Sequence, residues 1–372
     1  MRPRHILIAC DKFKGSLSAL DVCTAIARGL ATRWPSAMIT IHPIADGGEG
    51  FAETLLTPLK GRWVECLAHE ALGRLIPARY VLADSADGPL AVMEMAEASG
   101  LWRIPAAERD ILAATTTGTG EMMRHAITNS GACRIVLGIG GSATNDGGAG
   151  MAAALGVRFL AADQSVLHPS PGCLARHLAH VDTSGMLHLP PITAACDVSS
   201  PLLGPDGATR VFGPQKGADE ASMPVLEAAL EKIIRLTDGA RLADFPGAGA
   251  AGGLGFGLLR FAAAELVPGF DLLASLTGLT EQIAAADLVI TGEGRLDAQT
   301  LSGKGPAGIA RLARARGIPI WAFCGSADSL ARQSGLFQQI IELAATGLAF
   351  PELLANAAGL LESLAASSEL SE

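Results

Sequence analysis

The sequence predicts an α/β fold in two parts, and three stretches carry that prediction. Residues 5–10 form a continuous apolar run typical of a buried parallel strand, and a helical pattern follows it. Residues 62–96 contain short extended runs instead, which indicates a more strand-rich unit. The alternation of strand and helix returns at residues 286–290. We therefore expect α/β structure at both chain ends and a second unit between them.

The composition is that of a globular, acidic protein. The chain has 372 residues, enough for two cores, of which 49% are hydrophobic and 17% charged. A net charge of −9 without a basic run argues against a nucleic-acid or membrane-surface partner. No apolar stretch has membrane-spanning length, and the N-terminal run is too short for a signal peptide. The seven cysteines lack paired spacing and are typical of reduced thiols, so we expect a cytoplasmic protein.

Two strand–helix units open the chain, and each strand ends in a charged loop that contains glycine. The first strand, 5–10, leads into residues 11–16 and a helix that Ser18 and Asp21 can cap. The second strand, 37–44, leads into residues 45–50 and a helix from Phe51. Ligands of open α/β sheets bind outside the carboxyl ends of the strands, so both loops are candidate binding loops.

A third strand, 134–138, leads into a glycine-rich loop and a helical segment at 151–155. The unpaired N–H groups of such a loop and the helix dipole favour an anion, so we predict a ligand loop. Asp146 within the loop fits a phosphate if a divalent cation lies between them. The loop lacks the Gly-Lys-Ser/Thr ending of a Walker A motif. Its spacing matches a dinucleotide fingerprint only loosely, at Gly138, Gly140 and Ala143, because paired glycines would fill the first helical turn.

The remaining segments follow the same pattern of strands that end in polar loops. A strand at 192–196 ends in Asp197 and a long loop to residue 217, and loops of that length are usually functional. A helix at about 220–237 and a glycine-rich stretch at 246–257 come next. We then expect a strand at 286–290 with a charged loop after it, strands at 318–324 and 338–343, and helices at 307–316 and 351–364.

Five of these loops resemble the motifs of the bacterial glycerate kinases of the glycerate 2-kinase type. They are residues 11–16 (DKFKGS), 45–50 (ADGGEG), 140–148 (GGSATNDGG), 212–218 (FGPQKGA) and 291–297 (TGEGRLD). The resemblance implies ATP-dependent phosphorylation of D-glycerate with Mg²⁺, giving 2-phosphoglycerate or, as the alternative, 3-phosphoglycerate. It also implies a Rossmann-like three-layer domain from both chain ends, 1–65 and 286–372, with a second α/β domain, 66–285, inserted.

Phosphoryl transfer needs cations on the phosphates, a metal held by carboxylates, and a base or orienting group for the attacking hydroxyl. Such residues occur in the five motifs and also outside them, at Asp197 after a predicted strand and at Lys304 before a predicted helix. The expected catalytic residues are Asp11, Lys12, Lys14, Asp46, Asp197, Glu293 and Asp297. The expected ATP-binding residues are Gly140, Gly141, Ser142, Thr144, Asn145, Asp146, Gly147, Gly148 and Lys216, with Lys216 in a flexible loop that closes over ATP. Substrate residues are Ser16, Gly47, Gly48, Arg295 and Lys304, and the expected Mg²⁺ ligands are Asp46 and Asp146.

Each charged candidate also has a purely structural interpretation. Asp46 can cap a helix, with Glu49 beside the helix dipole. Asp197 can form an Asx-turn, and Arg295 can pair within its own loop. The base stays open among the four candidate aspartates, which are Asp46, Asp146, Asp197 and Asp297.

Two other functions compete with the kinase hypothesis, and one group of residues has the spacing of a possible metal site. The loose fingerprint allows a dinucleotide-dependent 2-hydroxy acid dehydrogenase. A non-catalytic protein that binds a small acid is disfavoured, because several carboxylates lie in the glycine loops and indicate a metal. Cys173, His177 and His180 have a vaguely zinc-like spacing, but no second cysteine pair supports them, and we expect surface residues. A monomer and a homodimer are both compatible with the sequence.

Overall fold

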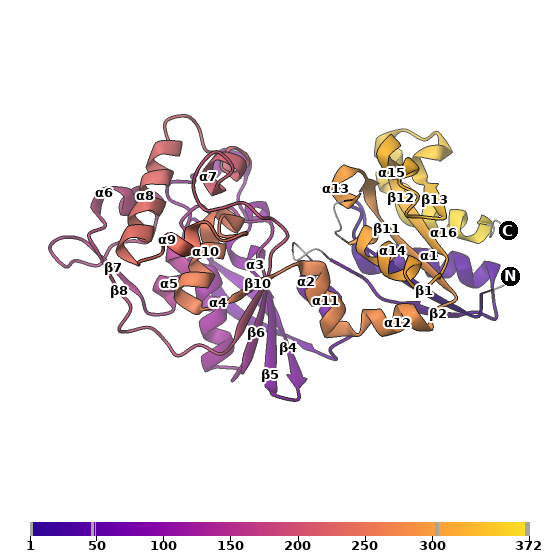
Figure 1. The fold of residues 1–372 in the computed structure, drawn as a ribbon, viewed down its shortest axis with the longest axis horizontal. Coiled ribbons are helices and arrows are strands. Elements are labelled where there is room, and N and C mark those ends of the chain that lie inside the picture. Colours follow the sequence, from indigo (N-terminus) through magenta and orange to yellow (C-terminus); the bar gives the residue numbers. More distant parts are fainter. Residues whose placement is uncertain (1–2, 46–47, 49, 302–304, 369–372) are drawn as a thin grey trace. The chain divides into compact units, whose positions relative to one another are not determined.

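The computed structural model describes residues 3–45, 48, 50–301 and 305–368. The chain forms two compact units: residues 1–46 with 270–372 (unit 1) and residues 47–269 (unit 2) (Figure 1). The sequence pattern placed these divisions later, after residues 65 and 285. The chain changes units earlier because α2 (Phe51–Leu56) packs on strands of unit 2, whereas α12 (Leu279–Ala285) contacts the first strand of unit 1.

Unit 1 is built on a parallel sheet of five strands in the order β13-β12-β11-β1-β2 (Figure 1). The strands are β1 (His5–Cys10), β2 (Met38–Ile41), β11 (Leu288–Leu296), β12 (Ile320–Ala327) and β13 (Gln339–Glu342). The sheet extends from β1 to β2 on one side and from β11 to β13 on the other. The order therefore reverses between β1 and β11, and the crevice at such a reversal is where ligands bind in open α/β sheets.

Helices cover both faces of this sheet, so unit 1 is a three-layer, Rossmann-like structure as expected. Helices α1 (Ala19–Arg33) and α16 (Phe350–Ser367) share a core with Ile8, Trp321 and Phe323. Helix α14 (Pro306–Arg314) contacts β1, β11 and β12 instead. The predicted cap is present, because the Ser18 hydroxyl accepts the Asp21 N–H. The other elements are α11 (Gly269–Thr277), α12, α13 (Ala298–Leu301), α15 (Ser329–Gln333) and the 3₁₀ helix η4 (Leu343–Thr346).

Unit 2 contains a mixed sheet of six strands in the order β10-β9-β6-β5-β4-β3. Strands β3 (Arg62–His69), β4 (Leu75–Ser85) and β5 (Gly88–Glu94) are antiparallel neighbours, which explains the strand-rich pattern from Arg62. Strands β6 (Arg134–Gly138), β9 (Ile192–Ala195) and β10 (Glu265–Val267) continue the sheet in parallel. The inserted unit is thus also α/β.

The helices of unit 2 enclose a large apolar core. Helices α4 (Thr117–Thr128) and α5 (Ala149–Ala154) pack against each other and contribute Met122 and Met151 to it. Strands β7 (Arg158–Leu160) and β8 (His180–Asp182) form a separate pair. The other elements are α3 (Ala96–Ser99), η1 (Leu101–Arg103), η2 (Ala106–Glu108), α6 (Pro171–His177), α7 (Ala208–Phe212), η3 (Pro214–Lys216), α8 (Met223–Leu236), α9 (Ala240–Ala243) and α10 (Ala250–Ala262).

Two predicted loops contain regular structure. The strand expected to end at Ile290 continues to Leu296, because β11 pairs with β12 as far as Ala327. Residues 198–217, expected to be unstructured, include α7 and η3. Over the described part of the chain, no helix combines the length and the hydropathy needed to cross a bilayer.

Candidate active site

Two predicted polar groups and one that was not predicted lie at one edge of the unit 2 sheet. The carboxyl ends of β5, β6 and β9 lie in register, because Glu94 pairs with Gly138 and Gly138 with Ala195. The glycine-rich loop follows β6, and Asp197 follows β9 two residues later. The edge therefore carries Glu94, the loop 139–148 and Asp197, in the position where α/β sheets bind ligands.

Asp146 is fully buried and acts as the central acceptor of this edge. Its Oδ2 accepts the Thr116 N–H at 2.7 Å, the Thr116 hydroxyl at 2.8 Å and the Gly150 N–H at 3.0 Å. Its Oδ1 accepts the Gly148 N–H at 3.1 Å. Burial raises the pKa of the Asp146 carboxyl, although these hydrogen bonds act in the opposite direction.

These contacts change the interpretation of Asp146 and of the loop after it. The Gly148 N–H, expected to bind a phosphate, donates to the Asp146 carboxylate instead, and so does the Gly150 N–H. A carboxylate that joins the starts of α4 and α5 serves the backbone, and a metal at the same oxygens would displace its donors. Asp146 therefore has a structural role in the described part of the chain, and its expected role as a Mg²⁺ ligand stays a prediction.

The second half of the loop is also held from behind by α10. Ala251, Gly252 and Gly253 have φ values of 54°, 66° and 87°, a left-handed break inside that helix. The Gly147 N–H donates to the Gly252 carbonyl at 3.0 Å. A Cβ on Gly252 would lie 1.9 Å from the Thr144 carbonyl oxygen, so only glycine permits this approach of two backbones.

In the first half of the loop, residues 140–145, most backbone N–H groups have no acceptor among the described residues. Ala143 N–H donates to Ser99, but five other N–H groups find no acceptor among the described residues. They belong to Gly140, Gly141, Ser142, Thr144 and Asn145. The buried Thr144 Oγ1 and Asn145 Oδ1 likewise lack a partner there. Unpaired buried polar groups are costly, so residues 140–145 form the part of the loop suited to a polar ligand.

Lys216 lies against this half of the loop and is not on a flexible lid. Only 2% of the residue is exposed, and its ammonium donates to the Ser142 hydroxyl at 2.7 Å and to the Thr144 carbonyl at 2.8 Å. Burial lowers the pKa of Lys216 to about 7, with Asp146 acting in the opposite direction. The predicted proximity to the glycine loop is present, but the lysine reaches it from a short 3₁₀ helix in which Lys216 is buried while Pro214 and Gln215 are exposed.

Glu94 is a polar residue of this edge that the sequence analysis missed. Its carboxylate accepts the Gly50 N–H at 3.0 Å and the Ala52 N–H at 2.8 Å, and so caps the start of α2. A signal was present, because Glu94 is a charged residue within the otherwise apolar run Leu90–Met95. Asp197, in contrast, was expected, and its Oδ1 accepts the Gly269 N–H at 2.9 Å.

Unit 1 gathers a second set of predicted residues where its strand order reverses. Asp11 follows β1 and donates its N–H to the Gly292 carbonyl of β11 at 2.8 Å. The Asp11 carboxylate accepts the Lys12 N–H at 2.6 Å. Glu293 lies on β11, one residue past Gly292, which pairs with Cys10. Asp11, Lys12 and Glu293 therefore lie at the crevice that the fold provides for a ligand.

Arg295 and Asp297 extend this set along β11 and past its end. The Glu293 carboxylate accepts the Thr300 hydroxyl at 2.5 Å, and that hydroxyl accepts the Asp297 N–H at 3.0 Å. Arg295 Nε lies 3.8 Å from Asp297 Oδ2, and 71% of the Arg295 side chain is exposed. The structural alternative for Arg295, an ion pair within its own segment, is thus present, in a loose and exposed form.

The other expected residues of unit 1 are less informative. Lys14 is exposed, and the Ser16 hydroxyl donates to the Leu354 carbonyl of α16 at 2.7 Å. Ser16 therefore stabilises the fold through that bond. Gly48 of unit 2 accepts the Phe51 N–H at 3.1 Å. Asp46, Gly47, Glu49 and Lys304 lie outside the described residues.

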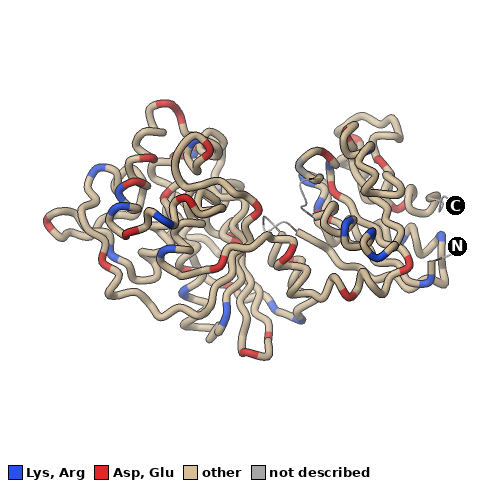
Figure 2. The backbone as a smooth tube through the Cα atoms, viewed as in Figure 1, with Lys and Arg blue, Asp and Glu red and all other residues tan. Residues whose placement is uncertain are grey.

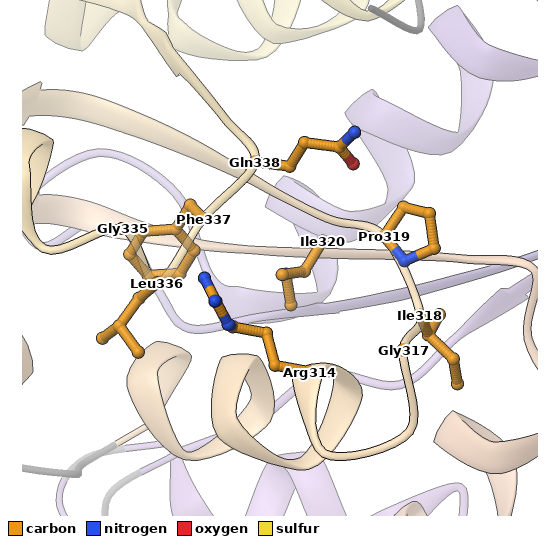
Figure 3. Close-up of a pocket in the computed structure, with 9 residues that line it drawn as sticks. All are labelled: Arg314, Gly317, Ile318, Pro319, Ile320, Gly335, Leu336, Phe337 and Gln338. Carbon is orange, nitrogen blue, oxygen red and sulfur yellow. The ribbon is translucent and has the colours of Figure 1, made fainter. Parts of the chain in front are cut away.

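A shallow hollow of about 410 Å³ in unit 1 is not part of either set (Figure 3). Figure 3 shows Arg314 of α14 beside Phe337, with Gln338 and Ile320 near the strands. These residues lie where β12 and β13 begin, whereas Asp11 and Glu293 lie toward the carboxyl ends of their strands. Its lining residues are Arg314, Gly317, Ile318, Pro319, Ile320, Gly335, Leu336, Phe337 and Gln338.

The described residues contain no group of three or more His, Cys, Asp or Glu side chains that could hold a metal ion. Cys173, His177 and His180 thus form no such group. Mg²⁺ does not need a closed protein cage, because it keeps several waters and binds one or two carboxylates together with substrate phosphates. Carboxylates at the strand ends, such as Asp197 and Glu293, fit that way of binding. Figure 2 shows acidic and basic residues spread over each unit, consistent with the absence of a basic run.

The loop after β6 does not follow the dinucleotide fingerprint, because α5 begins only at Ala149 and Thr144–Gly148 are not helical. Two α/β units with polar groups at the carboxyl ends of parallel strands define the class of α/β proteins that bind small ligands at that edge of the sheet. A model of the glycerate kinase family matches residues 6–368, and the chain belongs to this family. The resemblance noted in the five motifs is therefore confirmed.

Individual relatives agree with the family match. The glycerate kinase of Bacillus subtilis (strain 168) is 44% identical over 340 residues, covering 90% of this chain and 87% of the relative. The glycerate 2-kinase of Escherichia coli (strain K12) is 42% identical over 327 residues, covering 86% and 85%. A crystal structure described as glycerate kinase 2 of Salmonella typhimurium LT2 superposes with a TM-score of 0.84 at 40% identity, covering 98% of this chain and 97% of that one.

Proposed function

We propose that this protein transfers the γ-phosphate of ATP to a hydroxyl of D-glycerate and forms 2-phosphoglycerate. Membership of the glycerate kinase family supports the reaction, and the Escherichia coli relative named glycerate 2-kinase supports the 2-position. The observation that carries the proposal is the first half of the glycine loop. Its unpaired N–H groups next to the Lys216 ammonium suit the oxygens of a phosphate chain.

The roles follow from what each group can offer. Gly140–Asn145 and Lys216 bind the phosphates of ATP through backbone N–H groups and one cation. Lys12 and Arg295, at the strand ends of unit 1, bind the glycerate carboxylate, and the guanidinium can do so with two hydrogen bonds. Asp11, Asp197, Glu293 and Asp297 are the described candidates for the group that orients the attacking hydroxyl.

Mg²⁺ would reach this site with ATP and would screen the negative charge of the phosphates. Asp197 is the described carboxylate of unit 2 that would complete its coordination beside the phosphates. The protein's own contribution is to bind the phosphate chain and the glycerate at fixed groups, which lowers the barrier by positioning.

The test is a transfer assay with ATP, Mg²⁺ and D-glycerate, with the product identified by proton-coupled phosphorus NMR. A doublet identifies phosphate on the secondary carbon and supports 2-phosphoglycerate, whereas a triplet identifies the 3-isomer and corrects the position. Lys12→Met should lose most of the activity, and Lys232→Met should keep it, because this half-buried lysine of α8 belongs to neither candidate set. A folded protein that transfers no phosphate to D-glycerate would overturn the proposal, and turnover with NAD or NADP and a 2-hydroxy acid would favour the dehydrogenase.

A further inference from the structure

Lys216 is bound in an unusual way for a buried cation. Both acceptors of its ammonium, the Ser142 hydroxyl and the Thr144 carbonyl, are neutral. An ammonium has three N–H donors, and the third finds no acceptor among the described residues. A buried lysine without an ion-pair partner is costly to charge, so its protonation depends on what lies beside it.

The charged groups around Lys216 do not supply that partner. Asp146 is the acidic neighbour that acts on it, but its oxygens accept the N–H groups of α4 and α5. The Arg109 guanidinium donates to the Gln215 carbonyl next to Lys216 and adds positive charge.

On the flanking segments, the charges are directed elsewhere. Arg210 on α7 is exposed and contacts Met223, and Asp219 forms hydrogen bonds with Ser222. Lys216 therefore contacts two neutral acceptors, and its acidic neighbour Asp146 already accepts hydrogen bonds from other groups.

We propose that binding of the nucleotide's phosphates to residues 140–145 takes up one proton from solvent at the Lys216 amine. This inference rests on the proposed function, because it assigns the phosphates of ATP to this half of the loop. A phosphate chain brings several negative charges to the lysine and favours its ammonium form. The bound ammonium then has a charged partner for its third N–H, and the affinity for nucleotide rises as the pH falls from 9 to 7.

The low pKa of Lys216 in the ligand-free protein supports uptake of a proton on binding. Because burial lowers the pKa of Lys216 to about 7, the amine is mostly neutral at pH 8 before the nucleotide binds. At pH 6 it is already charged, so little uptake is left. Uptake should thus be close to one proton at pH 8, roughly half a proton at pH 7 and small at pH 6.

The test is titration calorimetry of the full chain with Mg²⁺ and ADP, which cannot phosphorylate glycerate. Titrations at pH 6, 7 and 8 are run in pairs of buffers with different ionisation enthalpies, and the difference gives the number of protons bound. ADP itself takes up little at pH 8, because its phosphate pKa lies near 6. Lys216→Arg keeps the charge at every pH, so it should retain binding and lose the uptake at pH 8. Lys232→Arg is the matched control and should keep the uptake.

Three results would overturn the inference: binding by the wild-type protein without uptake at pH 8, uptake that does not fall toward pH 6, or unchanged uptake in Lys216→Arg. The first two do not depend on how any variant folds. As an independent measurement, ¹³C NMR of labelled lysines should show one titration near pH 7 that moves above pH 8 with ADP. If the folded wild-type protein does not bind ADP at all, the proposed function fails, and the inference fails with it for that separate reason.

Discussion

The two sheet edges hold their charges in different ways. In unit 2, Asp146 and Lys216 are almost fully buried, and their oxygens and ammonium bind the backbone or hydroxyls of the same unit. In unit 1, Asp11, Glu293 and Arg295 lie at positions with partial or high exposure around the point where the strand order reverses. Both edges looked alike in the sequence, as charged residues beside glycines.

This difference separates charges that shape the backbone from charges that can meet a substrate. A buried carboxylate with four donors fixes where two helices begin, and its removal leaves those donors unpaired. A half-exposed arginine or lysine is hydrated before a ligand arrives and adds little to stability. We therefore expect substitutions in the unit 2 edge to lower the free energy of unfolding. Substitutions in the unit 1 edge should lower activity with little effect on stability.

The largest effect is expected for Asp146→Ala. It leaves the donors of Thr116, Gly148 and Gly150 without their acceptor and should lower the free energy of unfolding by about 4 kcal/mol. Asp146→Asn keeps an oxygen where three of the four donors converge and should lose roughly half as much. Urea unfolding measures both variants. A loss below ~1 kcal/mol for Asp146→Ala would show that the carboxylate does not hold the loop.

Gly252→Ala should come next, with a loss of about 3 kcal/mol. Its Cβ would overlap the Thr144 carbonyl oxygen, and its φ of 66° is strained for any residue with a Cβ. Gly359→Ala on α16 is the matched control, because no atom lies within 4 Å of its Cβ and alanine favours a helix. That control should gain up to ~1 kcal/mol. Equal melting temperatures for the two variants would contradict the close packing at Gly252.

A pH dependence of the ligand-free protein should follow from Lys216. Its folded pKa of about 7 lies below the unfolded value of 10.5, so the unfolded state binds more protons between these values. From this group alone, the free energy of unfolding is lowest below pH 7. It rises by roughly 1 kcal/mol per pH unit between pH 7.5 and 9.5. Urea unfolding of the wild-type protein and Lys216→Met across this range measures the difference. Parallel curves for the two proteins would contradict the prediction.

Arg295→Ala should change stability least, by less than about 0.5 kcal/mol, because the pair with Asp297 is long and exposed. If Arg295 binds the glycerate carboxylate, KM for D-glycerate should rise by roughly 10–100-fold with little change in KM for ATP. Arg28→Ala removes an exposed pair with Glu362 between α1 and α16 and serves as the control. A variant at Arg295 with unchanged KM for glycerate would remove this residue from the proposed site.

The sequence predicted the fold well because unit 1 uses simple local patterns. The apolar run at residues 5–10 and the Ser18–Asp21 cap needed no knowledge of distant contacts. The end of β11 was wrong, because residues 291–296 look like a loop but are paired with β12 along their length. When pairing with a neighbouring strand decides where a strand ends, that end cannot be predicted from the residues of the strand itself.

The site was predicted less well, since its character depends on burial. Asp146 carries the same charge whether it meets a metal or only its present donors, which are three N–H groups and one hydroxyl, and the positions of these donors on Thr116, Gly148 and Gly150 follow only from the fold. Lys216 looked mobile because its segment is rich in glycine and proline, yet Ser142 and Thr144 hold it from 72 to 74 positions away. Glu94 was not predicted because its partners, Gly50 and Ala52, lie more than 40 positions away in the sequence.

The central strand of unit 1 has a consequence for biosynthesis. Strand β1 pairs with β11 through Ile6 and Leu288, so its partner leaves the ribosome only after all of unit 2 has been made. At about 5–20 residues per second, an apolar strand waits roughly 15–60 s for that partner. Unit 2 can fold during this interval, while the nascent N-terminus offers an unprotected strand to chaperones. Slow translation late in the message should therefore lengthen the period in which this protein is prone to aggregate.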